Sequence, residues 1–137
     1  MAYLGLDLGT KTLGIAISKT GLIAQGYEEF IFEEENYDKA IEEVLRIIEK
    51  EGIDKICLGL PLNMNGSESK MSGICREFKQ KLEERCNIKV DLVDERMTSM
   101  LANRILIEHD ISRAKRKKVV DKLAAQTILE TYLNGGN

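Results

Sequence analysis

Two almost wholly apolar runs open the chain, and a short polar turn separates them. Residues 2–8 form the first run and residues 13–18 the second, with a Gly-Thr-Lys-Thr turn between them. Hydrophobic runs joined this closely, through residue types that hairpins use, predict two antiparallel strands in the middle of a sheet. Residues 22–32 carry β-branched and aromatic side chains and predict a third strand, with a bulge at Gly26.

The rest of the chain alternates between helical and strand patterns. Apolar residues recur at helical spacing from residue 40 to Gly52, a residue type that often follows a helix. The pattern then predicts strands over residues 53–60 and 88–93, a helix over 68–85, a helix from Thr98 or Ser99 to about His109, a charged stretch over 110–118 and a last helix over 119–133. The order βββαβαβαα fits one domain over residues 1–137.

This order predicts an α/β fold with a mixed five-stranded sheet and helices on both faces. The first three strands are joined by short turns, so we expect them to be antiparallel. Strands reached through helices are expected to be parallel, by right-handed crossovers. Ligand sites in such sheets collect at the carboxyl ends of the parallel strands. Asp7, the segment 59–63 and Glu95 all fall at the carboxyl ends of predicted strands.

Composition and charge narrow the class of protein. The chain has 43% apolar and 31% charged residues, no apolar run near the ~20 residues of a membrane span and no signal peptide, so we expect a cytoplasmic globular protein without membrane contact. Three cysteines without a Cys-x-x-Cys pair and one histidine predict reduced thiols and no zinc site. The net charge is −3, yet residues 96–122 carry +5 and the remainder −8. One basic third is compatible with a polyanion that docks on one side of the molecule.

Asp7 is out of place at the end of an apolar strand. Carboxylates are depleted in strands, and burying one without a partner costs several kcal/mol. A bound cation would compensate for that cost. Alternatively, the Asp7 side chain caps the following turn by accepting hydrogen bonds from the main chain of Thr10 or Lys11. Both explanations are open for this strand taken by itself.

Asp121 lies on the apolar face of the last predicted helix. Asp121, Ala124, Ala125 and Ile128 are spaced i, i+3, i+4 and i+7, so they share one face. Small alanines let a helix lie close to a sheet, which would bring Asp121 within reach of the strand ends. Glu130 is nine residues further on, about 180° around the helix, and is expected in solvent.

Three acidic side chains, Asp7, Glu95 and Asp121, are therefore expected to converge from two strand ends and a helix. Crowded carboxylates repel one another unless protons or metal ions neutralise them. Hard oxygen ligands without a His/Cys set favour Mg²⁺ or Mn²⁺, and a pair of such ions ~3.5–4 Å apart promotes phosphodiester cleavage. Asp94 competes with Glu95, because neighbours on a strand point to opposite faces and only one can face the site.

A run of cations precedes the last predicted helix. It consists of Arg113, Lys115, Arg116, Lys117 and Lys118. A solvated loop is the simpler interpretation. However, cations just before a helix are disfavoured by the helix dipole, and bound phosphates would relieve that cost. Because no aromatic residue interrupts the run, we expect contact with a nucleic-acid backbone rather than base stacking or sequence readout.

Three residues near the expected acidic cluster are further candidates for nucleic-acid contacts. Lys11 and Arg96 are candidate phosphate ligands because each lies beside one of the acids in sequence. Thr98 follows closely and could donate a hydrogen bond to substrate, although its residue type equally suits a helix cap.

Four separated segments, taken together, resemble the YqgF (RuvX-like) family of the RNase H-like fold. Residues 5–11 (GLDLGTK) resemble the family's first-strand motif, and residues 59–63 (GLPLN) with Gly66 resemble its Gly-x-Pro loop. Residues 95–99 (ERMTS) resemble its Glu-Arg-x-Thr-Thr box, with a serine as the second hydroxyl residue. Residues 121–125 (DKLAA) resemble its final helix. The resemblance covers nearly the whole chain.

By position, the resemblance implies that Asp7, Glu95 and Asp121 are the metal-binding catalytic residues of a nuclease acting on structured nucleic acid. Members are described as nucleases that mature the ends of pre-16S rRNA and as Holliday junction resolvases. The first expectation is therefore a metal-dependent nuclease of pre-16S rRNA, and the alternative is a junction resolvase. Related junction resolvases place their second acid on the strand before the proline loop, where this chain has Gly59, so here the acid must come from the next strand.

Two further interpretations belong to other classes of protein. One is a non-catalytic RNA-binding factor on the same fold. The other follows from residues 7–11, since Asp-x-Gly-Thr-Lys also resembles the phosphate loop of sugar and acetate kinases. Those enzymes close two such domains around ATP, and this chain has residues for only one. A symmetric junction calls for a dimer, whereas end trimming needs one active site, so we expect a monomer or a weak homodimer.

Overall fold

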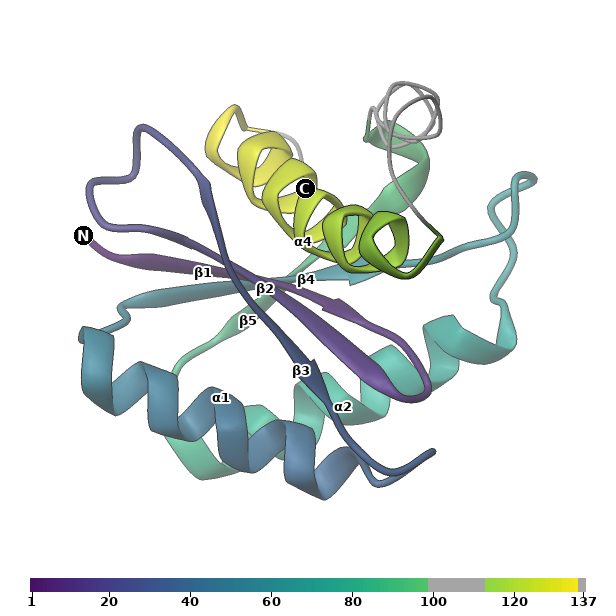
Figure 1. Cartoon of the computed structure of the whole chain (residues 1–137), viewed down its shortest axis with the longest axis horizontal. Coiled ribbons are helices and arrows are strands. Elements are labelled where there is room, and N and C mark those ends of the chain that lie inside the picture. Colours follow the sequence, from purple (N-terminus) through teal and green to yellow (C-terminus); the bar gives the residue numbers. More distant parts are fainter. Residues whose placement is uncertain (99–112, 136–137) are drawn as a thin grey trace.

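A twisted five-stranded sheet with the strand order β3-β2-β1-β4-β5 forms the centre of the protein (Figure 1). The computed structural model describes residues 1–98 and 113–135, with side chains described for 1–98 and 123–135. The strands are β1 (Tyr3–Leu8), β2 (Thr12–Ser18), β3 (Gln25–Ile31), β4 (Lys55–Leu60) and β5 (Val90–Asp94). The first three are antiparallel, and β4 and β5 run parallel to β1. The predicted α/β fold with a mixed sheet is confirmed.

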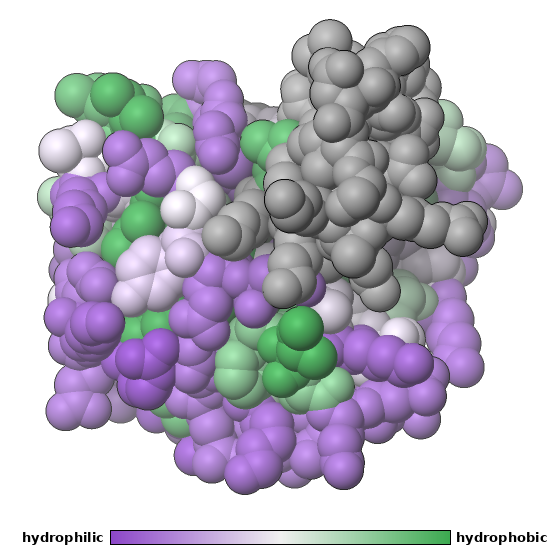
Figure 2. All heavy atoms as spheres, viewed as in Figure 1, coloured by the Kyte–Doolittle hydropathy of each residue, from purple (hydrophilic) through white to green (hydrophobic). Residues whose placement is uncertain are grey.

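Helices cover both faces of the sheet. On one face lie α1 (Tyr37–Glu51) and α2 (Lys70–Cys86), and on the other lies α4 (Arg113–Leu133); a short 3₁₀ helix, η1 (Glu95–Met97), follows β5. Side chains alternate between the two cores along β1. Leu4, Leu6 and Leu8 pack with α1 and α2, whereas Gly5 faces α4. On the face that Figure 2 shows, the coloured residues are mostly hydrophilic, with smaller hydrophobic areas between them. Among the described residues, every helix is too short or too polar to traverse a lipid bilayer.

The third strand is shorter than its hydrophobic pattern suggests. β3 begins at Gln25 because Leu22 and Ile23 are 83% and 68% exposed in the preceding connection, where they pair with no strand. The register with β2 shifts at the expected place. Ile15 pairs with Glu28 and Ala16 with Gly26, so Tyr27 is the additional residue of a bulge.

Capping interactions fix the ends of α1 and α2. Gly52 follows α1 in the left-handed conformation (φ 65°) and donates its N–H to the carbonyl of Ile48, as predicted from its residue type. α2 begins at Lys70 because Ser69 is its N-cap. The Ser69 hydroxyl accepts from the N–H of Ser72 at 3.0 Å, and the Ser72 hydroxyl accepts from the N–H of Ser69 at 2.8 Å. This reciprocal pair is a capping box.

The last helix begins six residues earlier than predicted. α4 starts at Arg113, so residues 113–118 form its first turns and are not a loop before it. The prediction was wrong because apolar periodicity begins only at Val119, whereas Arg, Ala and Lys are themselves strong helix formers. The cations lie within the amino-terminal turns of α4, where the dipole still disfavours them. The helix predicted from residue 98 or 99 to His109 lies outside the described residues.

α4 packs almost directly on the backbone of the sheet. Ala124, Ala125, Ile128 and Leu129 are buried, and Glu130 is exposed, as predicted. A Cβ atom on Gly5 would lie 2.7 Å from the Cβ of Leu129 and 3.2 Å from the carbonyl oxygen of Ala125. A glycine in β1 therefore permits the close contact that the small helix residues require.

A substitution at Gly5 tests this contact. Gly5→Ala places a methyl group against a Cβ atom and a helix carbonyl, neither of which can move aside, and should destabilise the fold by about 1–3 kcal/mol. Gly73 provides the matched control, since it lies inside α2 and its Cβ would meet nothing within 4 Å. Gly73→Ala should stabilise the fold by about 0.5–1 kcal/mol. Urea unfolding measures both values, and equal effects would contradict the packing described.

Candidate active site

Asp7 lies in a row of residues that crosses the sheet on the face covered by α4. Asp7 belongs to β1 and pairs with Gly14 of β2. The register of β1 with β4 pairs Leu6 with Leu58, so the next step along both strands places Gly59 on the other side of Asp7. Asp7 is half-buried and is flanked by glycines on both neighbouring strands. Because glycine has no side chain, these two neighbours leave space around the Asp7 carboxylate on this face.

The Glu95 carboxyl group fills the space above Gly59. Glu95 follows β5 directly and begins η1. Its Oε1 lies 2.9 Å from the position that a Cβ on Gly59 would take, and the Cδ1 of Ile128 lies 2.6 Å from the same position. The carboxyl group therefore lies over β4, next to the side chain of Ile128 from α4. Neighbouring strands are about 4.8 Å apart, so Gly59, above which this carboxyl group lies, is about one strand spacing from Asp7.

Besides burial, the negative charges of both carboxylates contribute to the raised pKa of a buried thiol, Cys75. The pKa of Cys75 is raised to about 12, chiefly by burial and then by the negative charges of Glu95 and Asp7. Cys57, Cys75 and Cys86 are all free thiols, and the first two are buried.

Asp94 has a different environment from Glu95. Its carboxylate accepts hydrogen bonds from the backbone N–H of Arg96 at 2.9 Å and from the Arg96 guanidinium at 2.7–3.1 Å. This guanidinium lowers the pKa of Asp94 below its ordinary value. Asp94 thus forms an ion pair at the end of β5, whereas Glu95 extends over the sheet.

Arg96, a candidate phosphate ligand from the sequence, also connects two segments of the protein. In addition to its ion pair with Asp94, its Nη1 donates to the carbonyl oxygen of Met64 at 3.2 Å. The side chain keeps 32% of its surface exposed. Thr98 donates its hydroxyl to the carbonyl of Glu95 at 2.8 Å and thereby closes η1. Sequence reasoning did not find the Arg96–Met64 contact, which joins positions 32 residues apart.

The loop after β4 is held in one conformation by its own polar side chains. The Asn63 amide donates to the Ser67 hydroxyl at 3.0 Å and to the Glu68 carbonyl at 3.2 Å. Asn65 accepts from the N–H and hydroxyl of Ser67. Gly66 adopts a positive φ of 88°, and a Cβ there would lie 3.3 Å from the Arg96 guanidinium. These hydrogen bonds hold the loop beside the carboxyl ends of β4 and β5.

The backbone of α4 carries Asp121 toward Asp7. Tyr132 lies against Tyr3 at the start of β1, with ring centroids 6.2 Å apart, while Ala125 lies over Gly5. The helix therefore runs antiparallel to β1, as Figure 1 shows. From Ala125 back to Asp121 the helix rises about 6 Å, and from Gly5 on to Asp7 the strand advances about 6.6 Å. Position 121 of the α4 backbone therefore lies toward the carboxyl end of β1; the Asp121 side chain lies outside the described part.

Glu29 is an acidic residue in the same cross-strand row that the sequence reasoning did not single out. It pairs with Gly14, which in turn pairs with Asp7. Its Oε2 is buried and accepts no hydrogen bond within the described residues. The alternation of β3 contained the signal, since Glu29 lies on the opposite face from Phe30, which packs with α1 and α2.

Oxygen donors dominate the site, which suits a hard divalent cation. Asp7 and Glu95 bring carboxylates to the α4 face, and Gly59 provides the cradle in which one of them rests. Among the described side chains, no histidine or cysteine joins these two carboxylates, and such a set of oxygen donors fits Mg²⁺ or Mn²⁺ better than zinc. Among the side chains that the structure describes, no group of three acids, histidines or cysteines lies close enough to hold a metal ion. The expected third ligand, Asp121, is not among those side chains.

The candidate nucleic-acid ligands lie near the same end of the sheet. Lys11 is exposed in the turn between β1 and β2. The backbone of the first turns of α4 lies toward this end as well (Figure 1). Those turns carry Arg113, Lys115, Arg116, Lys117 and Lys118, whose side chains lie outside the described part.

The sheet order, the helix across one face and the acids at the carboxyl edge define a protein of the RNase H-like class. RuvC from Thermus thermophilus, solved in complex with a Holliday junction substrate, matches with a TM-score of 0.62 over 100% of this chain and 98% of that chain, at 11% identity. A family model described as "RuvX: Holliday junction resolvase" matches residues 1–135. The chain belongs to the RuvX family, a family of nucleases, which are hydrolases of phosphodiester bonds.

Relatives of known name support the same assignment. A protein from Geobacillus kaustophilus is 46% identical over 135 residues, covering 98% of each chain. One from Bacillus subtilis is 46% identical over 138 residues, covering 100% of each. Both carry the name "Putative pre-16S rRNA nuclease".

Removing the Arg96 charge tests its structural role. In Arg96→Gln the pKa of Asp94 should rise to its ordinary value, because the guanidinium that favours the carboxylate is gone. The ion pair stabilises the fold above the ordinary aspartate pKa of about 3.9, and that contribution is lost as the pH falls through the lower folded-state value. A ¹³C NMR titration of side-chain carboxyls measures the change. Arg76→Gln, which removes the partner of Glu68, should leave Asp94 unaffected; an unchanged Asp94 in Arg96→Gln would refute the assignment.

Proposed function

We propose that this protein is a cytoplasmic, divalent-metal-dependent nuclease that processes the ends of pre-16S rRNA, with Asp7, Glu95 and Asp121 as its metal-binding catalytic residues. The observation that carries this proposal is the position of the Glu95 carboxyl group above Gly59, about one strand spacing from Asp7. Two carboxylates this close on a half-buried face repel each other unless cations or protons lie between them. A nuclease needs that arrangement.

Each acid has a distinct structural support. Asp7 comes from the central strand β1, whose backbone is paired on both sides. Glu95 is held by η1, which the Thr98 hydroxyl closes. The bound Mg²⁺ or Mn²⁺ ions, two of them with substrate present, would supply an activated water and stabilise the leaving oxygen. Asp7 and Glu95 place their half-buried carboxylates on the α4 face of the sheet, where they would hold these ions.

The RNA substrate is supported by the names of the relatives and by the charge distribution. Lys11 and the cations of residues 113–118 lie toward the same end of the sheet as the acids, and the basic third of the chain carries +5. Arg96 keeps part of its guanidinium exposed beside its ion pair with Asp94 and could contact a phosphate there. Phosphate contacts of this kind position a nucleic acid without reading its sequence. Thr98, whose hydroxyl is already engaged by Glu95, is the weakest of the proposed contacts.

A second candidate substrate is a four-way DNA junction. The description of the matching family model favours it, and the same acids would serve that reaction. The two substrates make different demands on assembly. A junction has two-fold symmetry and needs two active sites, whereas an RNA end needs one. The solution mass of the protein, alone and with each substrate, separates a monomer from a homodimer.

Removing one carboxylate tests the catalytic assignment. Asp7→Asn and Glu95→Gln keep the size of each side chain but lose its charge, so hydrolysis of pre-16S rRNA with Mg²⁺ or Mn²⁺ should fall by about a hundredfold or more. Asp121→Asn should do the same. Glu130→Gln is the matched control on α4, because Glu130 is exposed and should not affect the rate.

The same assay separates the classes of function. Cleavage by Asp7→Asn at the parental rate would refute the catalytic role of Asp7. RNA binding that survives both chelation and the loss of Asp7, without cleavage of RNA or of junctions by the parent, would indicate a non-catalytic RNA-binding factor. Cleavage of junctions alone would transfer the assignment to DNA.

The space above Gly59 allows a sharper test. In Gly59→Ala the new methyl group would lie 2.9 Å from the Oε1 of Glu95 and 2.6 Å from the Cδ1 of Ile128, so the carboxyl group and the Ile128 side chain must both shift. We expect activity to fall at least about tenfold, and the double variant with Glu95→Gln to be no worse than Glu95→Gln. Gly73→Ala is again the control. If Gly59→Ala and Glu95→Gln reduce activity independently, the carboxyl group is not held by this cradle.

A further inference from the structure

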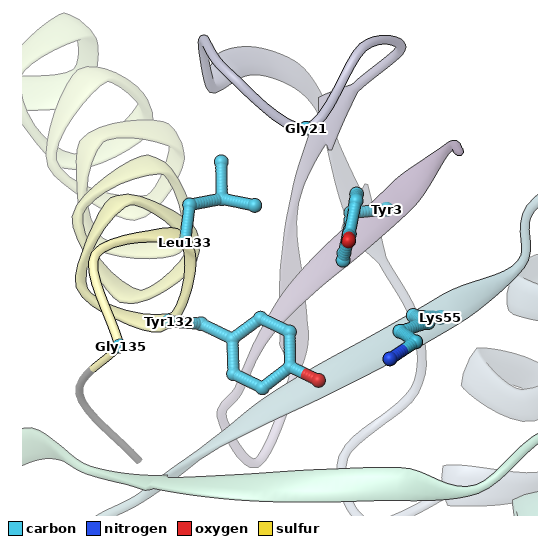
Figure 3. Close-up of a pocket in the computed structure, with 6 residues that line it drawn as sticks. All are labelled: Tyr3, Gly21, Lys55, Tyr132, Leu133 and Gly135. Atoms are coloured by element: carbon cyan, nitrogen blue, oxygen red, sulfur yellow. The ribbon is translucent and has the colours of Figure 1, made fainter.

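A cavity of about 280 Å³ opens at the end of the sheet opposite the candidate active site (Figure 3). Six residues line it: Tyr3, Gly21, Lys55, Tyr132, Leu133 and Gly135. They come from the starts of β1 and β4, the connection between β2 and β3, and the end of α4. Along β1, Tyr3 is four residues from Asp7, which corresponds to about 13 Å. The cavity is therefore separate from the acidic cluster.

Two tyrosine rings form the aromatic part of the cavity, and both are held in place. Tyr3 and Tyr132 contact each other edge to face, with ring centroids 6.2 Å apart and planes at 63°. The Tyr132 hydroxyl donates to Asp91 at 2.5 Å, which anchors the ring to β5. Gly21 has a φ of 83°, and a Cβ there would lie 2.8 Å from the Tyr3 ring. A glycine at this position thus allows the loop to approach the ring closely.

Lys55 provides an unneutralised cation beside these rings. Its ammonium group forms no ion pair with any residue that the structure describes, and Figure 3 shows it extending toward the Tyr132 hydroxyl. The nearby acids have other partners. Asp91 binds Tyr132 and lies 3.6 Å from Lys89, and Asp54 accepts from the N–H of Ala2 at 2.8 Å.

We propose that this cavity binds a nucleotide, with the base against the tyrosine rings and the phosphate at Lys55. Aromatic rings next to a cation are the combination that proteins use to bind bases and backbone of single-stranded nucleic acid without sequence preference. A volume of about 280 Å³ is at the small end of ligand pockets and suits one nucleotide. The nucleotide is either free or one unit of an RNA strand, and the inference does not depend on the proposed catalytic residues.

Tyrosine NMR provides a direct test because the chain has four tyrosines and no tryptophan. With ring-labelled tyrosine and EDTA present, uridine 5′-monophosphate should shift the signals of Tyr3 and Tyr132. The signals of Tyr27 and Tyr37, which pack on the opposite face of the sheet, should not move. Absence of any shift at Tyr3 and Tyr132 up to several millimolar nucleotide would overturn the proposal, and so would an equal affinity for inorganic phosphate.

Substitution of Lys55 tests the phosphate position. Lys55→Gln should weaken binding of uridine 5′-monophosphate about tenfold and leave binding of uridine unchanged, since uridine has no phosphate. Lys50→Gln, on α1, is the matched control and should alter neither. Equal loss of both ligands in Lys55→Gln, or no loss of either, would refute the phosphate assignment. Tighter binding of a uridine pentanucleotide than of the mononucleotide would identify an RNA strand as the source, and equal binding a free nucleotide.

Discussion

The close contact between α4 and the sheet is the constraint on which the rest of this structure depends. Gly5 lets the helix backbone approach β1, and Gly59 leaves room for both Ile128 and the Glu95 carboxyl group. A side chain at either position would increase the distance between helix and sheet. Every element that brings acids to the carboxyl edge, namely β1, the end of β5 and α4, is positioned by this contact. Its small residues are therefore as important for the site as the acids themselves.

The same contact explains how β4 participates in the site without an acid of its own. Gly59 leaves the α4 face of β4 without a side chain, and Glu95 extends across from the end of β5. The carboxyl group therefore reaches the space above β4 from the neighbouring strand. Arg96 and Thr98 support this arrangement, one by holding Asp94 and the loop after β4, the other by closing η1.

Much of the fold follows from local patterns, and the differences have physical causes. The hairpin, the bulge near Gly26 and the cap at Gly52 follow from short-range chemistry, and the directions of the strands follow from the lengths of their connections. The start of α4 was predicted too late because periodicity reports burial, and the first turns of that helix lack an apolar stripe. For the site, the sequence indicated Asp7 and Glu95. It contained no signal for the Arg96–Met64 contact, which joins residues that are 32 positions apart, whereas the alternation along β3 did place Glu29 on the α4 face.

The contact between Arg96 and the loop after β4 has a consequence for variation. Arg96 binds the carbonyl oxygen of Met64, not its side chain, and that side chain is 86% exposed. A backbone acceptor is present whichever amino acid occupies the position. The side chain at the tip of this loop can therefore vary among relatives while the anchoring of the loop stays the same.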